Sequence, residues 1–169
     1  NPAGQGPAGV QGPTGPAGAS GISTTASASY WSNQTQGPFT ANSVQAMTLN
    51  NTDWQQGITL QNSSQIKMTA AGKYNIMFSA QLEQQQSSGI VNIWLRKNGT
   101  DVPDSNTRVN IAASSPYVVA AWNFFVNSAI NDYYEIMWSS SSANTILESA
   151  TYNTFPKIPS VILTVNQVG

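Results

Sequence analysis

The sequence of 169 residues predicts an all-β, antiparallel sandwich that forms a homotrimer behind a short N-terminal triple-helical segment. Three observations lead to this fold class. Glycine occupies every third position from Gly6 to Gly21. After that segment, short runs rich in β-branched and aromatic residues alternate with Asn, Gly, Ser and Pro, without a sustained helical period. Two of these runs are apolar at nearly every position, which requires a second buried surface on the same strands.

The first element, residues 1–21, is a predicted stalk. Three polyproline-II chains wind together only if the residue at the shared axis lacks a side chain, so this repeat requires two partner chains. The run resembles collagen, and its prolines always follow glycine directly, as in the collagen-like stalks of bacteria and phages. A plain Gly/Pro linker is the alternative, but a linker does not need a strict period. The repeat consists of Gly6, Gly9, Gly12, Gly15, Gly18 and Gly21, with Pro7, Pro13 and Pro16.

Residues 22–29 form a predicted hinge, and residues 30–169 form a head large enough for one domain with its own core. Charged residues make up 8% of the chain and its net charge is -1, so we expect no nucleic-acid partner. The sequence holds no apolar run long enough to cross a membrane, and we expect no membrane insertion. Asn, Gln, Ser and Thr account for 67 of the 169 residues, an uncharged polar composition that suits an extracellular protein.

The head opens with predicted strands over residues 28–31, 45–49, 54–60, 65–69, 73–82 and 90–97, each rich in strand-forming side chains. The dipeptide Ala71-Gly72 supplies a turn before the strand 73–82, and Asn98-Gly99 supplies a turn after the strand 90–97. Residues 90–97 alternate strictly, which predicts one face in the core and the other in water. The inward face is Val91, Ile93 and Leu95, and the outward face is Asn92, Trp94 and Arg96.

The later predicted strands cover residues 108–113, 117–126, 133–139 and 160–166, with turn signals at residues 115–116 and 131–132. Residues 118–126 and 161–165 are apolar on both faces. One face of such a strand packs on the intramolecular core, so we expect the other to pack on a neighbouring subunit. At about 25 cal/mol per Å², several hundred Å² of contact would stabilise a trimer by on the order of 10 kcal/mol. The predicted trimer core is Val119, Ala121, Phe125 and Ile162.

Several motifs of the head resemble those of C1q and tumour-necrosis-factor-like domains. Residues 69–79 (TAAGKYNIMFS) are similar to the Gly-x-Tyr-x-Phe strand of that family, and residues 91–99 (VNIWLRKNG) to its Val-x-Leu-x-Lys-Asn-Gly element. Asn131 and Asp132 stand where the family has Gly-Asp, and residues 159–165 (PSVILTV) match a terminal strand. The resemblance implies a jelly-roll protomer in a compact threefold head.

The composition excludes most catalytic and metal chemistry. The chain has no histidine and no cysteine, which removes Ser-His-Asp and Cys-His sites as well as thiolate or imidazole metal ligands. A paired-carboxylate glycan hydrolase remains, but the spacing of the seven acidic residues does not favour it. Asp101 and Asp104 flank a proline in a pattern typical of a solvated turn rather than a Ca²⁺ site. We therefore expect no enzyme, no metal and no cofactor.

Tryptophan offers a second route to a binding site, because an indole face can pack against the C–H face of a sugar. Most of the five tryptophans are expected in the core, Trp122 and Trp138 clearly so. Trp94 lies on the polar side of its strand, between Asn92 and Arg96. We expect Trp94 to contact either a neighbouring subunit, the favoured alternative, or a ligand.

The resemblance also implies where a partner binds. In the family, both chain ends lie at the base, so the segments 83–89, 114–117 and 139–145 fall at the far tip. Two of these segments consist almost entirely of amide and hydroxyl side chains, which can bind a glycan or a polar protein. The candidate receptor-binding residues are Glu83, Gln84, Gln85, Gln86, Ser114, Ser115, Tyr117, Ser140, Ser141 and Asn144.

These features together predict a fibre-tip or spike protein on a phage or virus particle, which binds a host-surface glycan or protein through three identical sites. One alternative is a purely structural head that trimerises and registers the collagen-like stalk. A bacterial surface or spore-coat filament and a secreted animal C1q-like protein are further alternatives, and the proline placement disfavours the animal one.

Overall fold

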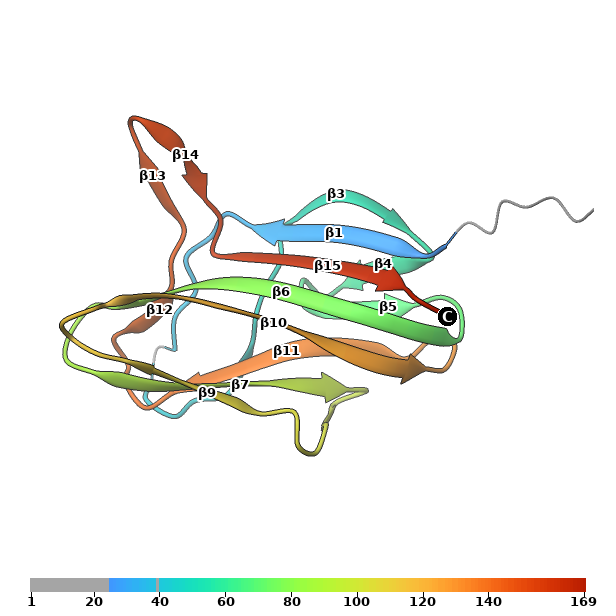
Figure 1. Ribbon diagram of the computed structural model, residues 1–169, viewed down its shortest axis with the longest axis horizontal. Helices are drawn as coiled ribbons and strands as arrows, with labels where there is room; N and C mark the ends of the chain where they lie inside the picture. The colour runs from blue at the N-terminus through green and yellow to red at the C-terminus, as the bar shows by residue number, and fades with distance from the viewer. Residues whose placement is uncertain (1–24, 39) are drawn as a thin grey trace, which may run out of the picture.

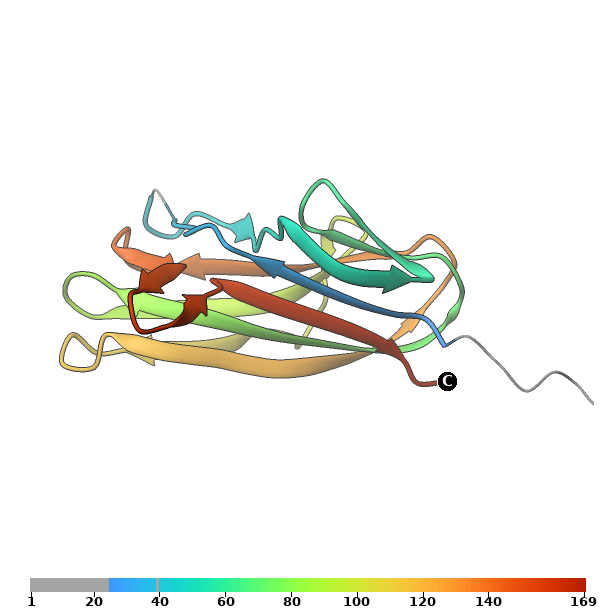
Figure 2. The same cartoon turned by 90° about the horizontal axis from the view of Figure 1, so that it is seen from above.

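The computed structural model describes residues 25–38 and 40–169, and every regular element in them is a β-strand. The predicted stalk and residues 22–24 of the predicted hinge lie outside these residues. Two antiparallel sheets pack face to face along the long axis of the molecule (Figures 1 and 2). The predicted all-β, antiparallel sandwich is confirmed.

The first sheet has the order β10-β6-β15-β1-β3, and β12 also pairs with β6. Its two longest strands pair over their full overlap, from Tyr117 opposite Glu83 to Ser128 opposite Gly72. The strands are β1 (Ser27–Ser32), β3 (Asn51–Gln56), β6 (Gly72–Gln84), β10 (Tyr117–Ser128), β12 (Thr145–Leu147) and β15 (Val161–Gln167).

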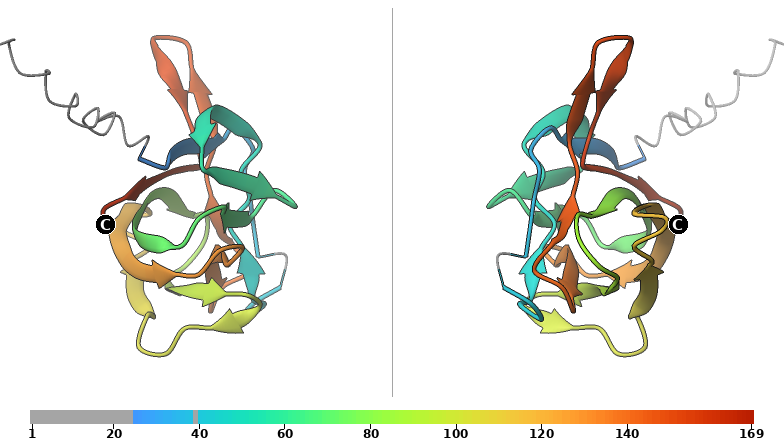
Figure 3. Two further views of the ribbon diagram at one scale, coloured as in Figure 1. Left: turned by 90° about the vertical axis from the view of Figure 1, so that its right-hand side faces the viewer. Right: turned by 90° about the vertical axis from the view of Figure 1, so that its left-hand side faces the viewer.

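The second sheet has the order β4-β5-β11-β7-β8, with β2 paired to β11 and β9 paired to β7. A separate hairpin of β13 (Ala150–Tyr152) and β14 (Phe155–Ile158) stands away from both sheets (Figure 3). The strands of the second sheet are β2 (Gln45–Ala46), β4 (Ile58–Gln61), β5 (Gln65–Met68), β7 (Gly89–Lys97), β8 (Thr100–Asp101), β9 (Thr107–Ile111) and β11 (Tyr133–Ser140).

The core lies between the sheets and is built by alternate residues of each strand. The side chains of β6 turn inward at every second position, and β7 does the same with Val91, Ile93 and Leu95, as predicted. Trp138 is fully buried there, and the ring of Phe78 meets Trp122 edge-on at 4.7 Å between centroids. Among the largest buried side chains are Tyr30, Tyr74, Tyr134, Ile66, Leu82 and Leu95.

The chain ends of the sandwich share one end of the molecule. β1 pairs with β15 in antiparallel register, with Ser27 opposite Asn166, so the first strand begins where the last strand finishes (Figure 1). β1 starts at Ser27, inside the segment 22–29 expected to be a hinge, and Ala26, Ala28 and Ser29 are buried. The opposite end of the sandwich consists of loops.

Gly57 divides the single strand expected over residues 54–60. The residues before it, in β3, pair with β1 in the first sheet, whereas β4 pairs with β5 in the second sheet. Gly57 has a φ of +67°, and a Cβ atom there would lie 2.7 Å from the Cβ of Ala26. The chain therefore crosses between sheets at a position that only glycine fits without strain.

Candidate functional site

Three loops that were predicted to share a tip do meet at one end of the sandwich. They are residues 85–88, 112–116 and 141–144, and they lie at the end opposite both chain ends of the sandwich (Figures 1 and 2). Backbone hydrogen bonds join them: Gln85 N–H donates to Asn144 O at 2.9 Å, and Gln84 N–H donates to Pro116 O at 2.8 Å. We call this end, with these three loops, the tip.

Most of the predicted receptor-binding residues are accessible at the tip. Glu83 and Asn144 are half-buried. The negative charge of Glu83 is the main cause that raises the pKa of the Tyr117 hydroxyl. The exposed side chains are amides, hydroxyls and one phenol, all of which form hydrogen bonds. They are Gln85, Gln86, Ser114, Ser115, Tyr117 and Ser141.

Gln84 and Ser140 are exceptions, and their prediction as contact residues is wrong. Gln84 is 3% exposed and Ser140 is fully buried. The amide of Gln84 donates to Ser142 Oγ at 3.0 Å and to Gln86 O, and its Oε1 accepts from Thr145 Oγ1 at 2.5 Å. Gln84 takes the inward position that follows Leu82 along β6, so it holds the tip loops together from below rather than meeting a partner.

The predicted trimer-core residues lie together on the outer side of the first sheet. Ile162 on β15 and Ala121 on β10 both lie opposite Ser79 of the central strand β6, so the three share one row and one face. Phe125 is 70% exposed and Val119 is 56% exposed. We define the outer apolar face by the large exposed side chains Met77, Val119, Phe125 and Ile162.

This arrangement explains the strands that are apolar on both faces. In β10 the inward residues Val118, Ala120, Trp122 and Phe124 pack on the core, and the residues between them point away from it. Large exposed apolar side chains gathered on one face often mark an interaction site. The outer apolar face is therefore a candidate interface.

The five tryptophans occupy different environments. Trp138 is in the core, as predicted, and Trp122 is half-buried against Phe78. Most of the five were expected in the core, and this expectation is wrong: Trp31 is half-buried, and Trp54 is 54% exposed on β3, at the edge of the first sheet. Trp94 lies on the outward side of β7, as predicted, and is half-buried.

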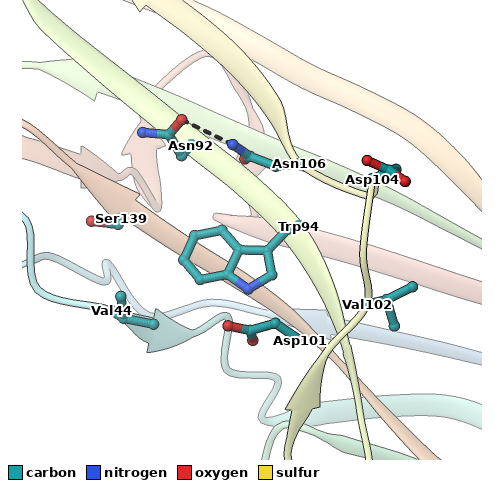
Figure 4. Close-up of a pocket in the computed structure, with 8 residues that line it drawn as sticks. All are labelled: Val44, Asn92, Trp94, Asp101, Val102, Asp104, Asn106 and Ser139. Atoms are coloured by element: carbon teal, nitrogen blue, oxygen red, sulfur yellow. Dashed lines mark hydrogen bonds between the residues drawn. The ribbon is translucent and has the colours of Figure 1, made fainter.

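Trp94 forms the floor of an open pocket of about 410 Å³ on the outer side of the second sheet. Figure 4 shows the indole ring face-on, with polar side chains around its rim. Asn106 Nδ2 donates to Asn92 Oδ1 at 3.2 Å beside the ring, and Ser139 of β11 lies opposite Asn92 in the sheet. Val44 and Val102 add apolar rim to the pocket.

Asp101 gives the pocket a fixed negative charge. Arg96 Nε lies 2.8 Å from Asp101 Oδ1, and this hydrogen bond is the main reason why the pKa of Asp101 is lowered. The indole N–H of Trp94 faces the same carboxylate and lowers that pKa further, although the nitrogen is buried and forms no hydrogen bond of normal geometry within the described residues. Asp104 lines the same pocket, so the wall carries two carboxylates.

Metal-ligating clusters and membrane-spanning helices are not found among the described residues. Within residues 25–38 and 40–169, no group of three or more acidic, His or Cys side chains lies close enough to hold a metal ion. None of the described segments forms a helix long and apolar enough to span a membrane. The absence of enzymatic activity stays a prediction.

Comparison with known proteins supports the fold. No family model matches the chain, and no curated protein sequence is significantly similar to it. Crystal structures of murine APRIL at pH 8.5 and pH 8.0 are similar to the chain, with TM-scores of 0.56 and 0.57 and sequence identities of 8% and 9%. Each alignment covers 86% of this chain and 100% of the APRIL chain. At this identity the likeness concerns the fold alone, an antiparallel sandwich that resembles a TNF-like jelly roll.

Proposed function

We propose that this chain is the trimeric head of a phage or virus fibre or spike, located on the virion outside the cell, which binds a host-surface receptor at its tip. The main support is the tip itself. Three loops, two of them almost entirely polar, meet at the end opposite the one where β1 begins, as a receptor-binding end of a stalked head requires. The receptor is a glycan or a polar protein, since the exposed tip side chains are amides, hydroxyls and a phenol.

Two further observations support a threefold assembly. The glycine repeat of residues 6–21 needs three chains to wind, and the outer apolar face offers each head a surface to bury against another copy. The resemblance of the fold to a TNF-like jelly roll is consistent with a head that self-associates and binds a receptor. Three tips on one axis would convert weak single contacts into useful avidity wherever the receptor is repeated on the host surface.

A competition experiment tests this proposal. The recombinant chain should bind host cells and block adsorption of the parent particle. The triple substitution Gln85→Ala, Gln86→Ala and Ser141→Ala should abolish that binding without changing the mass of the assembly, because all three side chains are exposed. A matched control replaces Gln56, Thr151 and Lys157, which are exposed outside the three tip loops, with Ala. If the tip variant binds cells as well as the control variant does, a structural head that only trimerises and registers the stalk is favoured instead.

A further inference from the structure

The pocket above Trp94 lies on the opposite side of the sandwich from the outer apolar face. Trp94 projects outward from β7 in the second sheet, while Val119, Phe125 and Ile162 project outward from the first sheet. The two sheets pack on each other through their inner faces (Figure 2). A trimer built on the outer apolar face would thus leave the pocket open on every subunit.

The composition of the pocket favours a small ligand over a protein interface. Interface cores are depleted in carboxylates, yet Asp101 and Asp104 both line this pocket. Small-molecule sites combine an apolar surface with a few fixed polar groups, and the indole of Trp94 with its polar rim has this composition. From this combination we propose that the pocket is a carbohydrate-binding site for an uncharged pyranose ring, separate from the tip.

The indole supplies the platform. Its ring lies flat across the strand and presents one face to the pocket, which suits the apolar C–H face of a pyranose. Trp94 is half-buried, so its orientation is set by the sheet beneath it rather than by the ligand. A preformed platform reduces the entropy lost on binding.

The rim supplies hydrogen bonds of the kind that hydroxyl groups need. The bond between Asn106 and Asn92 uses one N–H of Asn106 and leaves the Asn92 NH₂ group and the Asn106 carbonyl oxygen able to bond a ligand. One oxygen of Asp101 is held by Arg96, and the other can accept from a hydroxyl. Sugar hydroxyls both donate and accept, so they can satisfy amides and a carboxylate together.

The loop that carries Asp104 and Asn106 is fixed in place. Ser105 Oγ donates to Val102 O at 2.7 Å and accepts from Leu95 N–H at 3.1 Å, which ties the loop to β7. Val102 N–H also donates to Leu95 O at 2.9 Å. The pocket wall therefore keeps its shape without a ligand.

The charge of the pocket selects among sugars. The charged residues that line the pocket, Asp101 and Asp104, are both carboxylates. The guanidinium groups of Arg96 and of Arg108, which lies opposite Asn92 on β9, are outside the lining, so an anionic sugar would meet like charge. A cationic sugar would gain little attraction in this pocket, because Arg96 already neutralises Asp101 and water screens the exposed Asp104. A neutral glycoside avoids the repulsion and still uses the hydrogen bonds.

The experiment uses the full chain with all five tryptophans replaced by 5-fluorotryptophan, so that each gives its own ¹⁹F resonance. The probes are the methyl glycosides of glucose, galactose and mannose, with glucosamine and glucuronate as the cationic and anionic controls. At least one neutral glycoside should shift the Trp94 resonance with a Kd of roughly 1 to 10 mM, as is expected for one ring on one platform. Glucuronate should bind more weakly than that glycoside.

Substitutions locate the site. Trp94→Ala has no Trp94 resonance, so its binding is followed by saturation transfer to the glycoside, and it should be weaker by at least about tenfold. Trp54→Ala, which removes an exposed indole from the other sheet, should leave binding unchanged. Asn106 is exposed, so Asn106→Ala should fold normally and still weaken binding several-fold even if Trp94→Ala does not fold. The proposal is overturned if no neutral glycoside moves the Trp94 resonance, if glucuronate or glucosamine binds best, or if Trp94→Ala folds but dissociates the assembly.

Discussion

Lys97 Nζ lies 2.7 Å from Asp132 Oδ2, and this ion pair joins two turns that are far apart in the sequence. Beside it, Asn98 and Tyr133, which are 35 residues apart, also form a hydrogen bond. Asn98 donates from Nδ2 to Asp132 Oδ1 at 2.7 Å, and its Oδ1 accepts from Tyr133 N–H at 2.9 Å. Ala129 N–H donates to Asp132 Oδ2 at 2.7 Å. The Lys-Asn-Gly and Asn-Asp motifs of the sequence thus form one hydrogen-bonded unit at the end of the second sheet.

The first prediction concerns acid stability. Hydrogen bonds from Lys97, Asn98 and Ala129 lower the pKa of Asp132 from 3.8 to about 2. Because the pKa is lower in the folded state, the stabilisation is complete above pH 4 and is lost as the pH falls from about 4 to about 2. The loss should amount to about 2 kcal/mol per chain, measured as the free energy of unfolding in denaturant at each pH.

Asp132→Asn should remove that part of the pH dependence and lower stability at pH 7. Asp104→Asn, at an exposed carboxylate in the loop between β8 and β9, serves as the matched control and should leave the stability at pH 7 within about 0.5 kcal/mol. An acid profile for Asp132→Asn identical to that of the wild type would show that the ion pair does not couple the two turns.

The second prediction concerns the outer apolar face. Phe125→Glu and Val119→Glu should each dissociate the assembly, because burial of an unpaired carboxylate in an apolar contact costs several kcal/mol. The control is Ile130→Glu, at a residue that is also highly exposed but lies in the turn after β10. Sedimentation velocity should show a lower mass for the first two variants and no change for the third. Unchanged mass in all three would place the contact elsewhere.

The third prediction separates the structural and exposed residues of the tip. Gln84→Ala should lower the free energy of unfolding by about 2 kcal/mol, because it leaves Thr145 and Ser142 without their buried partner. Gln85→Ala removes an exposed amide of the same size from the next position and should change stability by less than about 0.5 kcal/mol. Denaturant unfolding monitored by tryptophan fluorescence measures both. Equal effects would mean that the network beneath the tip contributes nothing to stability.

The sequence allowed the main features of the sandwich to be predicted. The alternation in residues 90–97 predicted a strand with one face in the core and one polar face. The apolar runs in residues 118–126 and 161–165 predicted strands whose outward face is also apolar. The grouping of the tip loops followed from strand order, because alternate connections of an antiparallel jelly roll lie at the same end. The error at Gln84 arose because a polar tract hides the alternation that continues through it from Leu82.

Other features had no local signal in the sequence. The β13–β14 hairpin, with exposed Tyr152 and Phe155, was not predicted because its strands pair only with each other and show no inward face. Residues 54–60 were predicted as one strand, because the crossing at Gly57 depends on pairing with distant strands, β1 for β3 and β5 for β4, and not on the local sequence. The pocket at Trp94 needs residues from three strands and two loops, and only Trp94 was identified from the sequence as a ligand contact.

The fourth prediction tests the crossing at Gly57. Gly57→Ala should destabilise the head by about 1–3 kcal/mol, because φ is +67° and the added Cβ would lie 2.7 Å from Ala26. Gly37→Ala is the control, since a Cβ there meets its nearest neighbour, in Ile146, at an ordinary 3.6 Å. Thermal unfolding of both variants under the same conditions measures the difference. A Gly57→Ala variant as stable as Gly37→Ala would mean that the chain crosses between the sheets in another way.

The mass of the intact chain in solution tests the central claim most directly. Multi-angle light scattering at micromolar concentration should give three times the chain mass of 18.0 kDa, in a single peak that is stable on dilution. A folded species with the mass of one chain would contradict the account, because both the stalk and the outer apolar face would then lack the partners that they require.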